Sequence, residues 1–214
     1  MFVSHWMTKK VFTLSPEDSI IAASQLSKER GIKHIPIVTN EKIKGIISIR
    51  DINGYIPSRE RALDVHELHR LLTKTKVTDI MKKNVITVSP DTPVEEAALI
   101  LHDNNIGCLP VIEGSKLAGI ISDRDIFRVL VDITGVRHRG HRVSLPLKDE
   151  PGSLQAVSAI ISKHGFRLQS ILTSYEEVKK GYRHLIIRLK GSGNFAALKS
   201  ELEGTYLGVK IIKG

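Results

Sequence analysis

The chain contains the same unit twice, at residues 7–52 and 81–126. A shift of 74 positions aligns the copies without a gap, and 17 of the 46 paired positions are identical. Eight of the other 29 pairs exchange one apolar residue for another. Two copies are too few for a solenoid, which needs three or more units. The duplication therefore predicts one module built from two halves around a pseudo-two-fold axis, so that a pocket in one half has a counterpart in the other.

Each copy predicts the element order β-α-β-β-α. An extended segment at 11–14 or 85–88 ends at Ser-Pro, which favours a turn. Helical spacing follows, then a strand around Pro36 or Pro110 and a second strand that contains Gly-Ile-Ile. After the second copy the pattern changes to β-α-β-β-α-β, the ferredoxin-like arrangement. Its expected strands are 143–147, 166–174, 182–189 and 206–212, with helices at 154–164 and 195–202.

The chain is thus expected to be an α/β (α+β) protein with five regions. They are a first repeat at 1–54, a helical connector at 55–76, a second repeat at 77–134, a basic linker at 135–141 and a third region at 142–214. The connector contains His66 and His69, a spacing that can bind metal. Because no third ligand accompanies the pair, a surface helix is favoured and no metal site is expected.

Composition narrows the class of protein. The chain has one cysteine, Cys108, so it forms no intrachain disulfide, which fits a reducing cytoplasm. No segment resembles a signal peptide, and no apolar run approaches the ~20 residues that span a bilayer. No catalytic arrangement of side chains and no Walker-type loop stands out. We therefore expect a cytoplasmic protein without membrane contact that is not an enzyme and has no catalytic cofactor.

Both copies carry Ser-x-Arg-Asp directly after Gly-Ile-Ile, where a strand leads into a helix. A helix N-terminus favours an anion such as phosphate, and an aspartate there can accept hydrogen bonds from ribose hydroxyls. The same spacing is also a capping box, which only closes the start of a helix. One copy alone favours the cap; two copies at equivalent positions make a ligand site equally plausible. The residues are Ser48, Arg50, Asp51, Ser122, Arg124 and Asp125.

Each copy also places a proline inside an apolar strand, at Pro36 and Pro110. Proline donates no backbone hydrogen bond, so it belongs at a sheet edge or a bulge. Its apolar neighbours would form a slot for a flat base, and Thr13 or Thr87 would close the other side. The alternative is simply an edge strand.

Together, the Thr-x-Ser-Pro segment, the apolar-Pro-apolar strand and Gly-Ile-Ile-Ser-x-Arg-Asp resemble a tandem pair of cystathionine-β-synthase (CBS) domains, over about residues 4–130. The resemblance implies a regulatory module that binds AMP, ADP or ATP in clefts between the paired domains and that forms a homodimer. It also implies phosphate contacts from the serine and ribose contacts from the aspartate. The implied binding residues are Val11, Thr13, Ile35, Pro36, Ser48, Arg50, Asp51, Val85, Thr87, Leu109, Pro110, Ser122, Arg124 and Asp125.

The third region resembles an ACT domain, a small sensor often tuned to amino acids, through residues 145–153 and Gly165. Phe166-Arg167 stands where amino-acid-binding members often have asparagine. Two roles therefore remain for this region: it binds a ligand, or it serves only in dimerisation. The implied ligand residues are Asp149, Pro151, Gly152, Ser153 and Arg167. The whole chain resembles the acetoin-utilisation protein B (AcuB) family, which implies control of a partner enzyme or pathway, with acetoin or acetyl metabolism as one candidate and the target itself unknown.

The competing function is nucleic-acid binding through the third region. Residues 137–214 contain 14 lysines and arginines against 6 acidic residues, a net charge of +8, whereas residues 1–136 contain 18 against 17, a net of +1. A basic surface attracts nucleic acid or other anions. Aromatic residues form only 5% of the chain, so few stacking platforms are available. We therefore expect an adenosine nucleotide, and not a nucleic acid, as the partner.

The two copies differ inside the motif, where Ile49 corresponds to Asp123. If Asp123 faces its pocket, like-charge repulsion disfavours a long phosphate tail there. The first site is then expected to accept ATP or ADP better, and the second to prefer AMP.

Overall fold

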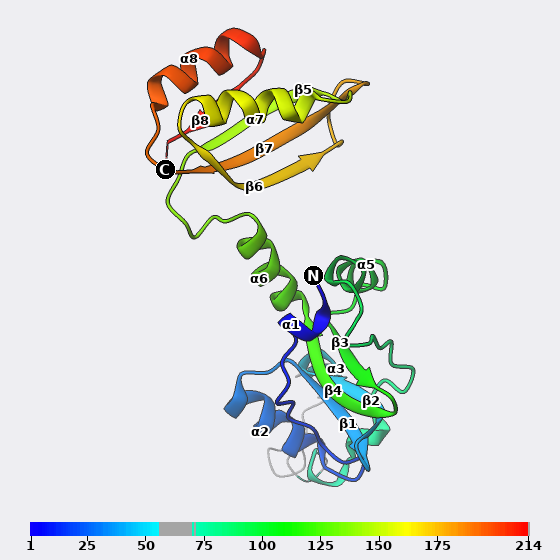
Figure 1. Ribbon diagram of the computed structural model, residues 1–214. Coiled ribbons are helices and arrows are strands. Elements are labelled where there is room, and N and C mark those ends of the chain that lie inside the picture. Colours follow the sequence, from blue (N-terminus) through cyan, green and yellow to red (C-terminus); the bar gives the residue numbers. More distant parts are fainter. Residues whose placement is uncertain (56–69, 71, 214) are drawn as a thin grey trace. The chain divides into compact units, whose positions relative to one another are not determined.

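The structure is a computed structural model that describes residues 1–55, 70 and 72–213 (Figure 1). The chain forms two compact units, Met1–Phe127 and Arg128–Gly214. The predicted pair His66 and His69 lies outside the described residues, as does most of the predicted connector.

The two repeats share one architecture within the first unit. A hairpin of antiparallel strands is flanked by helices in each repeat, and the strand registers match: His34 pairs with Ser48, and Cys108 pairs with Ser122. The first part of the unit contains α1 (Val3–Trp6), α2 (Ile20–Arg30), β1 (His34–Thr39), β2 (Lys42–Ser48), α3 (Ile49–Tyr55) and the 3-10 helix η1 (Val77–Asp79). The second part contains α5 (Val94–Asp103), β3 (Cys108–Glu113), β4 (Lys116–Ser122) and α6 (Asp123–Ile133), whose end passes into the second unit.

The expected first strand of each repeat is reduced to a single parallel bridge, Leu14 with Ile37 and Val88 with Val111. The Leu14 N–H donates to the Pro36 carbonyl at 3.2 Å, and the Val38 N–H donates to the Leu14 carbonyl at 2.9 Å. The next step of a parallel ladder would need an N–H at position 36, which proline lacks. The proline therefore stops the ladder, and a register shift follows at once, between Ile37 and Val38.

Each repeat completes its core with the first residues of the other repeat. Val3, at the start of the chain, packs in the second repeat's core with Leu109 and Ile121. Val77, at the start of the second repeat, packs in the first repeat's core with Ile35. Isolated β-bridges also connect the two repeats, joining Thr8 to Ile120 and Ile46 to Lys82. Fully burying one such aliphatic side chain stabilises a fold by about 1.5–3 kcal/mol, so each repeat depends on the other's leading segment.

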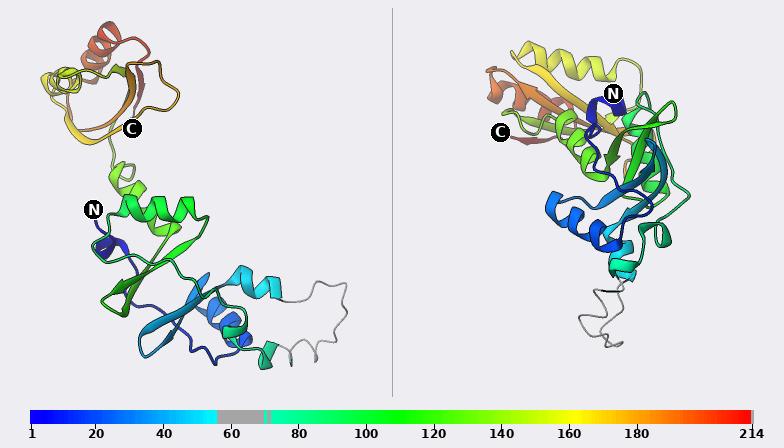
Figure 2. Two further views of the ribbon diagram at one scale, coloured as in Figure 1. Left: turned by 90° about the vertical axis from the view of Figure 1, so that its right-hand side faces the viewer. Right: turned by 90° about the horizontal axis from the view of Figure 1, so that it is seen from below.

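The second unit has the predicted order β-α-β-β-α-β. Its elements are β5 (Arg142–Lys148), α7 (Ser153–Lys163), β6 (Arg167–Ser174), β7 (Tyr182–Lys190), α8 (Phe195–Thr205) and β8 (Lys210–Ile212). They form one antiparallel sheet in the order β6-β7-β5-β8. Alternate residues of β5, such as Val143 and Leu145, are buried under α7 and α8, which cover one face of the sheet (Figures 1 and 2).

The last strand is shorter than expected. The sequence predicts a strand over 206–212, but β8 begins only at Lys210. Gly208 adopts φ +75°, a left-handed conformation that an extended strand excludes. Tyr206 and Leu207 therefore pass the end of β5 outside the sheet, which leaves space there.

Candidate functional site

The Ser-x-Arg-Asp motifs both form closed helix caps. The Ser48 backbone N–H and Oγ donate to Oδ2 of Asp51 at 2.8 and 2.6 Å. The Ser122 N–H and Oγ donate to Oδ2 of Asp125 at 3.0 and 2.7 Å. A carboxylate at a helix N-terminus also interacts favourably with the helix dipole. Both motifs therefore carry cap hydrogen bonds, to which the first adds a bond from the Asp51 N–H to Ser48 Oγ at 3.3 Å. A ligand would have to bind to a carboxylate that already accepts two hydrogen bonds.

Burial distinguishes the two caps. Asp125 is buried, with 8% of its surface exposed, whereas Asp51 is only half-buried. The motif arginines, Arg50 and Arg124, are exposed. The structure thus brings each serine and aspartate together, and it leaves the arginines at the surface.

The proline strands contribute to the core. Ile35, Pro36, Leu109 and Pro110 are all buried, so their side chains pack inside their repeats. The structure does not present them as an open apolar slot. The prolines alter the hydrogen bonding of the neighbouring backbone. Because position 36 cannot donate, the ladder hydrogen bond to the carbonyl of Phe12 is missing, and Pro110 interrupts the corresponding ladder of the second repeat.

The segments before the Ser-Pro turns lie nearer the surface. Val11, Thr13 and Val85 are half-buried, and Thr87 is exposed. Thr87 also lines a pocket of about 370 Å³ in the second repeat, together with residues of the Ser-Pro turn and of α5. Ligand sites commonly have volumes of ~300–1,000 Å³, so this pocket is large enough for a small molecule.

Sequence reasoning missed His34. A Cβ added to Gly107 would lie 2.8 Å from Cε1 of His34 and 3.8 Å from Oδ2 of Asp123, so the starts of β1 and β3 meet here. Burial lowers the pKa of His34 below its usual value, and the carboxylates of Asp123 and Asp51 partly oppose this shift. The available signal was the repeat alignment, which pairs this imidazole with Cys108 in otherwise apolar strands.

Cys108 lies at the equivalent position of the second repeat. It is 5% exposed, and burial raises the pKa of its thiol to about 12, with Asp123 adding to the effect. A thiol in this state is a poor nucleophile, because the thiolate is the reactive form. Cys108 is therefore a small buried apolar residue.

The residues expected to bind a ligand in the third region are only partly brought together. Arg183 forms an ion pair with Asp149 at 3.6 Å and donates to Ser153 Oγ at 3.4 Å, which ties the turn containing Pro151 and Gly152 to β7. Arg167 pairs with Lys190 at the far end of β7. At ~3.3 Å per residue this is roughly 25 Å away, so within one chain Arg167 does not join the turn.

Membrane spans and metal clusters are both absent from the described parts of the chain. None of the described helices combines the length and apolarity needed to cross a membrane. Within residues 1–55, 70 and 72–213, no three histidine, cysteine or acidic side chains gather in a way that would hold a metal ion.

Comparison with known proteins identifies the repeats. The CBS domain model matches residues 3–58 and 77–132. A CBS domain-containing protein of Dictyostelium discoideum is 30% identical over 141 residues, which cover 62% of this chain and 93% of that protein. Other curated relatives are much longer: the chain spans 45% of a 33.4 kDa protein of Thermofilum pendens and 31% of an inosine-5'-monophosphate dehydrogenase of Korarchaeum cryptofilum, at 31% identity to each.

Solved structures agree with this. A Vibrio cholerae protein assigned to acetoin utilization (AcuB) superposes with a TM-score of 0.54 at 29% identity, covering 64% of this chain and 95% of that one. The CBS domain pair of protein MJ0100, solved with 5'-methylthioadenosine and S-adenosylmethionine, gives 0.51 at 27% identity, covering 64% and 98%. The matched regions include both capped motifs and both proline strands. The chain therefore belongs to the CBS domain family and contains two CBS domains.

Proposed function

We propose that this chain is a regulatory protein whose CBS pair binds an adenosine-containing ligand and reports it to a partner. The observation that carries the proposal is the repetition of one polar arrangement at two helix starts, Ser48 with Asp51 and Ser122 with Asp125. Helix N-termini favour anions, and the aspartates can exchange a cap hydrogen bond for one from a ribose hydroxyl.

The interrupted ladders support the proposal. Position 36 cannot donate to the carbonyl of Phe12, and position 110 cannot donate to that of Ile86. A carbonyl beside the half-buried Val11 or Val85 is then a suitable acceptor for the exocyclic amine of adenine. Protein MJ0100, a CBS pair of similar fold, was solved with two adenosine-containing ligands, which makes the same ligand class a reasonable expectation here.

Regulation would follow from a shift in population. A ligand that contacts both repeats favours the packing that it binds more tightly, and the shift cannot exceed its difference in affinity for the two packings. The ferredoxin-like unit, which we propose to be an ACT-type sensor, would modulate the same equilibrium. We further propose a cytoplasmic homodimer without enzymatic activity that controls a partner enzyme, acetoin or acetyl metabolism being one candidate.

The test is isothermal titration of the full chain with AMP, ADP, ATP, NAD and S-adenosylmethionine. Asp51→Ala and Asp125→Ala should each weaken binding at their own site by about tenfold or more, since a charge-assisted hydrogen bond is lost. Both variants also lose a helix cap, which costs about 1 kcal/mol. Ser19→Ala is the matched control: Ser19 Oγ caps α2 by accepting from the Ala22 N–H at 3.3 Å, away from either motif.

If Ser19→Ala also lost ligand binding, the weaker binding of the aspartate variants would be explained by lower stability of the protein. Absence of heat with every ligand, in protein freed of carried-over nucleotide, would mean that the motifs serve only as helix caps.

A second candidate is nucleic-acid binding through the ferredoxin-like unit. On the sheet face opposite α7 and α8, Arg142 and Arg188 are direct cross-strand partners, an arrangement that gathers positive charge. The measurement is electrophoretic retardation of duplex and single-stranded DNA by the full chain at rising salt. Binding that weakens steeply with salt would favour this function, and absence of retardation at low salt would exclude it.

A further inference from the structure

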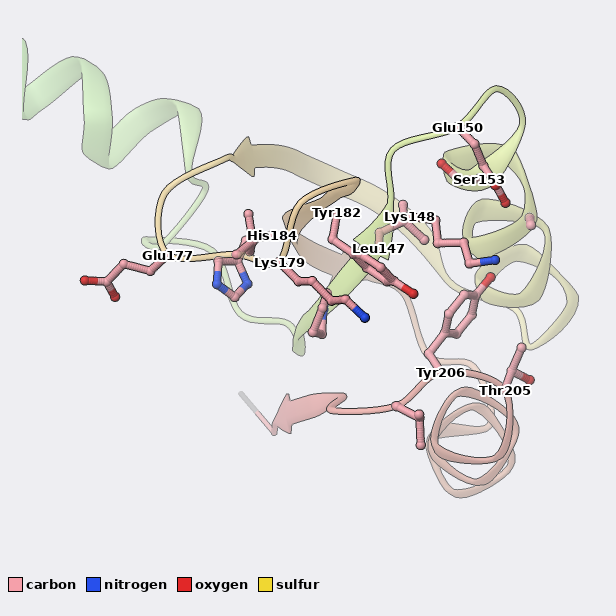
Figure 3. A pocket seen from close by; sticks show the side chains of 14 residues that line it. Leu147, Lys148, Glu150, Ser153, Glu177, Lys179, Tyr182, His184, Thr205 and Tyr206 are labelled. Carbon is pink, nitrogen blue, oxygen red and sulfur yellow. The ribbon is translucent and has the colours of Figure 1, made fainter.

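The second unit contains a pocket of about 590 Å³ at the end of β5 (Figure 3). Its walls come from the end of β5, the start of α7, the loop between β6 and β7, the start of β7 and the segment after α8. This volume is typical of sites for small organic ligands. The pocket shares no residue with the CBS motifs, so a ligand bound there is independent of the nucleotide proposal.

The short last strand creates this space. Strand β8 pairs with β5 only along Arg142–Ser144, and along the rest of β5 no described strand continues the sheet on that side. The chain after α8 passes there instead, and a Cβ on Gly208 would lie 3.4 Å from the ring of Pro146. The pocket therefore lies between the end of β5 and the segment that follows α8.

Part of the lining is apolar. Pro146, Val178 and Leu207 contribute hydrophobic surface, and Leu207 is 92% exposed despite its size. Covering apolar surface is favourable by about 25 cal/mol per Å², so a ligand with an apolar body would be stabilised against these side chains.

The polar lining combines two lysines and two tyrosines with two carboxylates, of which Glu150 lies near Ser153 (Figure 3). Figure 3 shows the side chains of Lys148, Lys179, Tyr182 and Tyr206 gathered around the pocket, while Glu177 points away from it. Lys148 and Tyr182 are register partners on β5 and β7, which fixes them side by side. Neither ammonium group pairs with a carboxylate of the described residues. Two unneutralised cations and two hydroxyl groups are suited to a carboxylate.

We propose that this pocket binds a small organic monocarboxylate with an apolar body about the size of one ring. The carboxylate accepts hydrogen bonds from Lys148 and Lys179 and from a tyrosine hydroxyl, and the body packs on Pro146 and Leu207. An α-amino acid fits less well, because its ammonium group would lie within a few ångströms of the lysines and be repelled.

The experiment uses the full chain and three probes: 3-phenylpropionate, the uncharged 3-phenylpropionamide, and phenylalanine. Titration calorimetry and saturation-transfer NMR are expected to detect the acid at about millimolar dissociation constants or tighter, with the amide and phenylalanine at least about tenfold weaker. Lys148→Gln and Lys179→Gln should each weaken the acid by roughly five- to tenfold. The matched control is Lys190→Gln, an exposed lysine at the other end of β7 that should leave binding unchanged.

A second variant tests the location without relying on charge. Ala156 is exposed on α7 and lines the pocket, so Ala156→Trp fills the space without entering the core. It should abolish binding of the acid, while thermal unfolding followed by circular dichroism stays unchanged. Equal affinity for acid and amide, tighter binding of phenylalanine, an unaffected Ala156→Trp variant, or no binding by the folded chain would each overturn the proposal. None of these outcomes affects nucleotide titration of the CBS pair.

Discussion

The hydroxyl of Ser122 donates a 2.7 Å hydrogen bond to an Asp125 carboxylate that is almost fully buried. The same bond in the first repeat, from Ser48, reaches a carboxylate that is half-buried. One motif thus occurs in two states of solvation. A ligand at the second repeat must displace more protein contacts to reach its aspartate, so we expect the two sites to differ in affinity even for the same ligand.

Asp123 should control the preference between nucleotides. Its carboxylate lies near His34 at the start of β1, where a phosphate tail of a ligand at the second motif would add negative charge. Asp123→Asn keeps the shape and removes the charge, so the affinity for ATP relative to AMP should rise about three- to tenfold. Calorimetric titration of both nucleotides measures the ratio. Asp103→Asn removes the same net charge at the end of α5 and should not alter it; an unchanged ratio in Asp123→Asn would refute the idea.

Gly45 and Gly119 should not tolerate alanine. A Cβ at Gly45 would lie 2.4 Å from Sδ of Met81 and 2.9 Å from the carbonyl of Lys82, and one at Gly119 would lie 2.6 Å from Sδ of Met7. Overpacking of this kind costs about 1–3 kcal/mol, which urea unfolding at equilibrium would measure.

Gly54→Ala is the control for these variants. Gly54 lies in α3, and an added Cβ meets nothing within 4 Å. Alanine should therefore stabilise that helix by about 0.5–1 kcal/mol. A loss of stability at Gly54 similar to that at Gly45 would show that the close approach of the two repeats is not what selects glycine.

His34 should make the first unit less stable in mild acid. Burial holds its folded-state pKa below the unfolded value of 6.5, so the unfolded chain takes up a proton first as the pH falls. The stabilising contribution is complete above about pH 6.5 and is lost as the pH falls toward the folded-state pKa. NMR titration of the imidazole gives the pKa, and urea midpoints give the stability. His34→Gln should flatten this pH dependence, whereas His102→Gln, which alters an exposed side chain, should preserve it.

Glu201 should make the second unit sensitive to stronger acid. Hydrogen bonds from Lys163 and then from His164 hold the pKa of this carboxyl below its usual 4.5. Its contribution is therefore present above about pH 4.5 and is lost as the pH falls through the folded-state pKa. Urea unfolding between about pH 3 and pH 6 measures it. Glu201→Gln should reduce the slope, and Glu203→Gln, which changes only a 3.8 Å pair with Lys199, should not; equal slopes in all three proteins would contradict the assignment.

Sequence reasoning predicted the parts of the fold that depend on residues close to one another in the chain. The repeated Gly-Ile-Ile-Ser-x-Arg-Asp places β2 and β4 in one register, and alternation along 143–147 places β5 with its apolar face toward the helices. Motif spacing also indicated the serine–aspartate hydrogen bonds as one of two alternatives, because Ser-x-x-Asp geometry is determined within one helical turn.

What escaped prediction depends on partners distant in sequence. The strand expected at 11–14 is reduced to a bridge by Pro36, which lies on a different strand. Val3 carries no periodic signal, since α1 has only four residues, so nothing in its neighbourhood indicated a place in the second repeat's core. The pocket beside β5 exists because Gly208 delays β8, an effect that the alternating pattern of 206–212 concealed.

The exchange of leading segments sets the smallest piece of this chain that can fold. A fragment that begins at residue 77 would contain the whole second repeat by sequence and still lack Val3 in its core, while one that ends at residue 54 would lack Val77. Deleting the first seven residues should therefore harm the distant repeat first. The two copies therefore form one cooperative folding unit, because each lacks part of its core without the other.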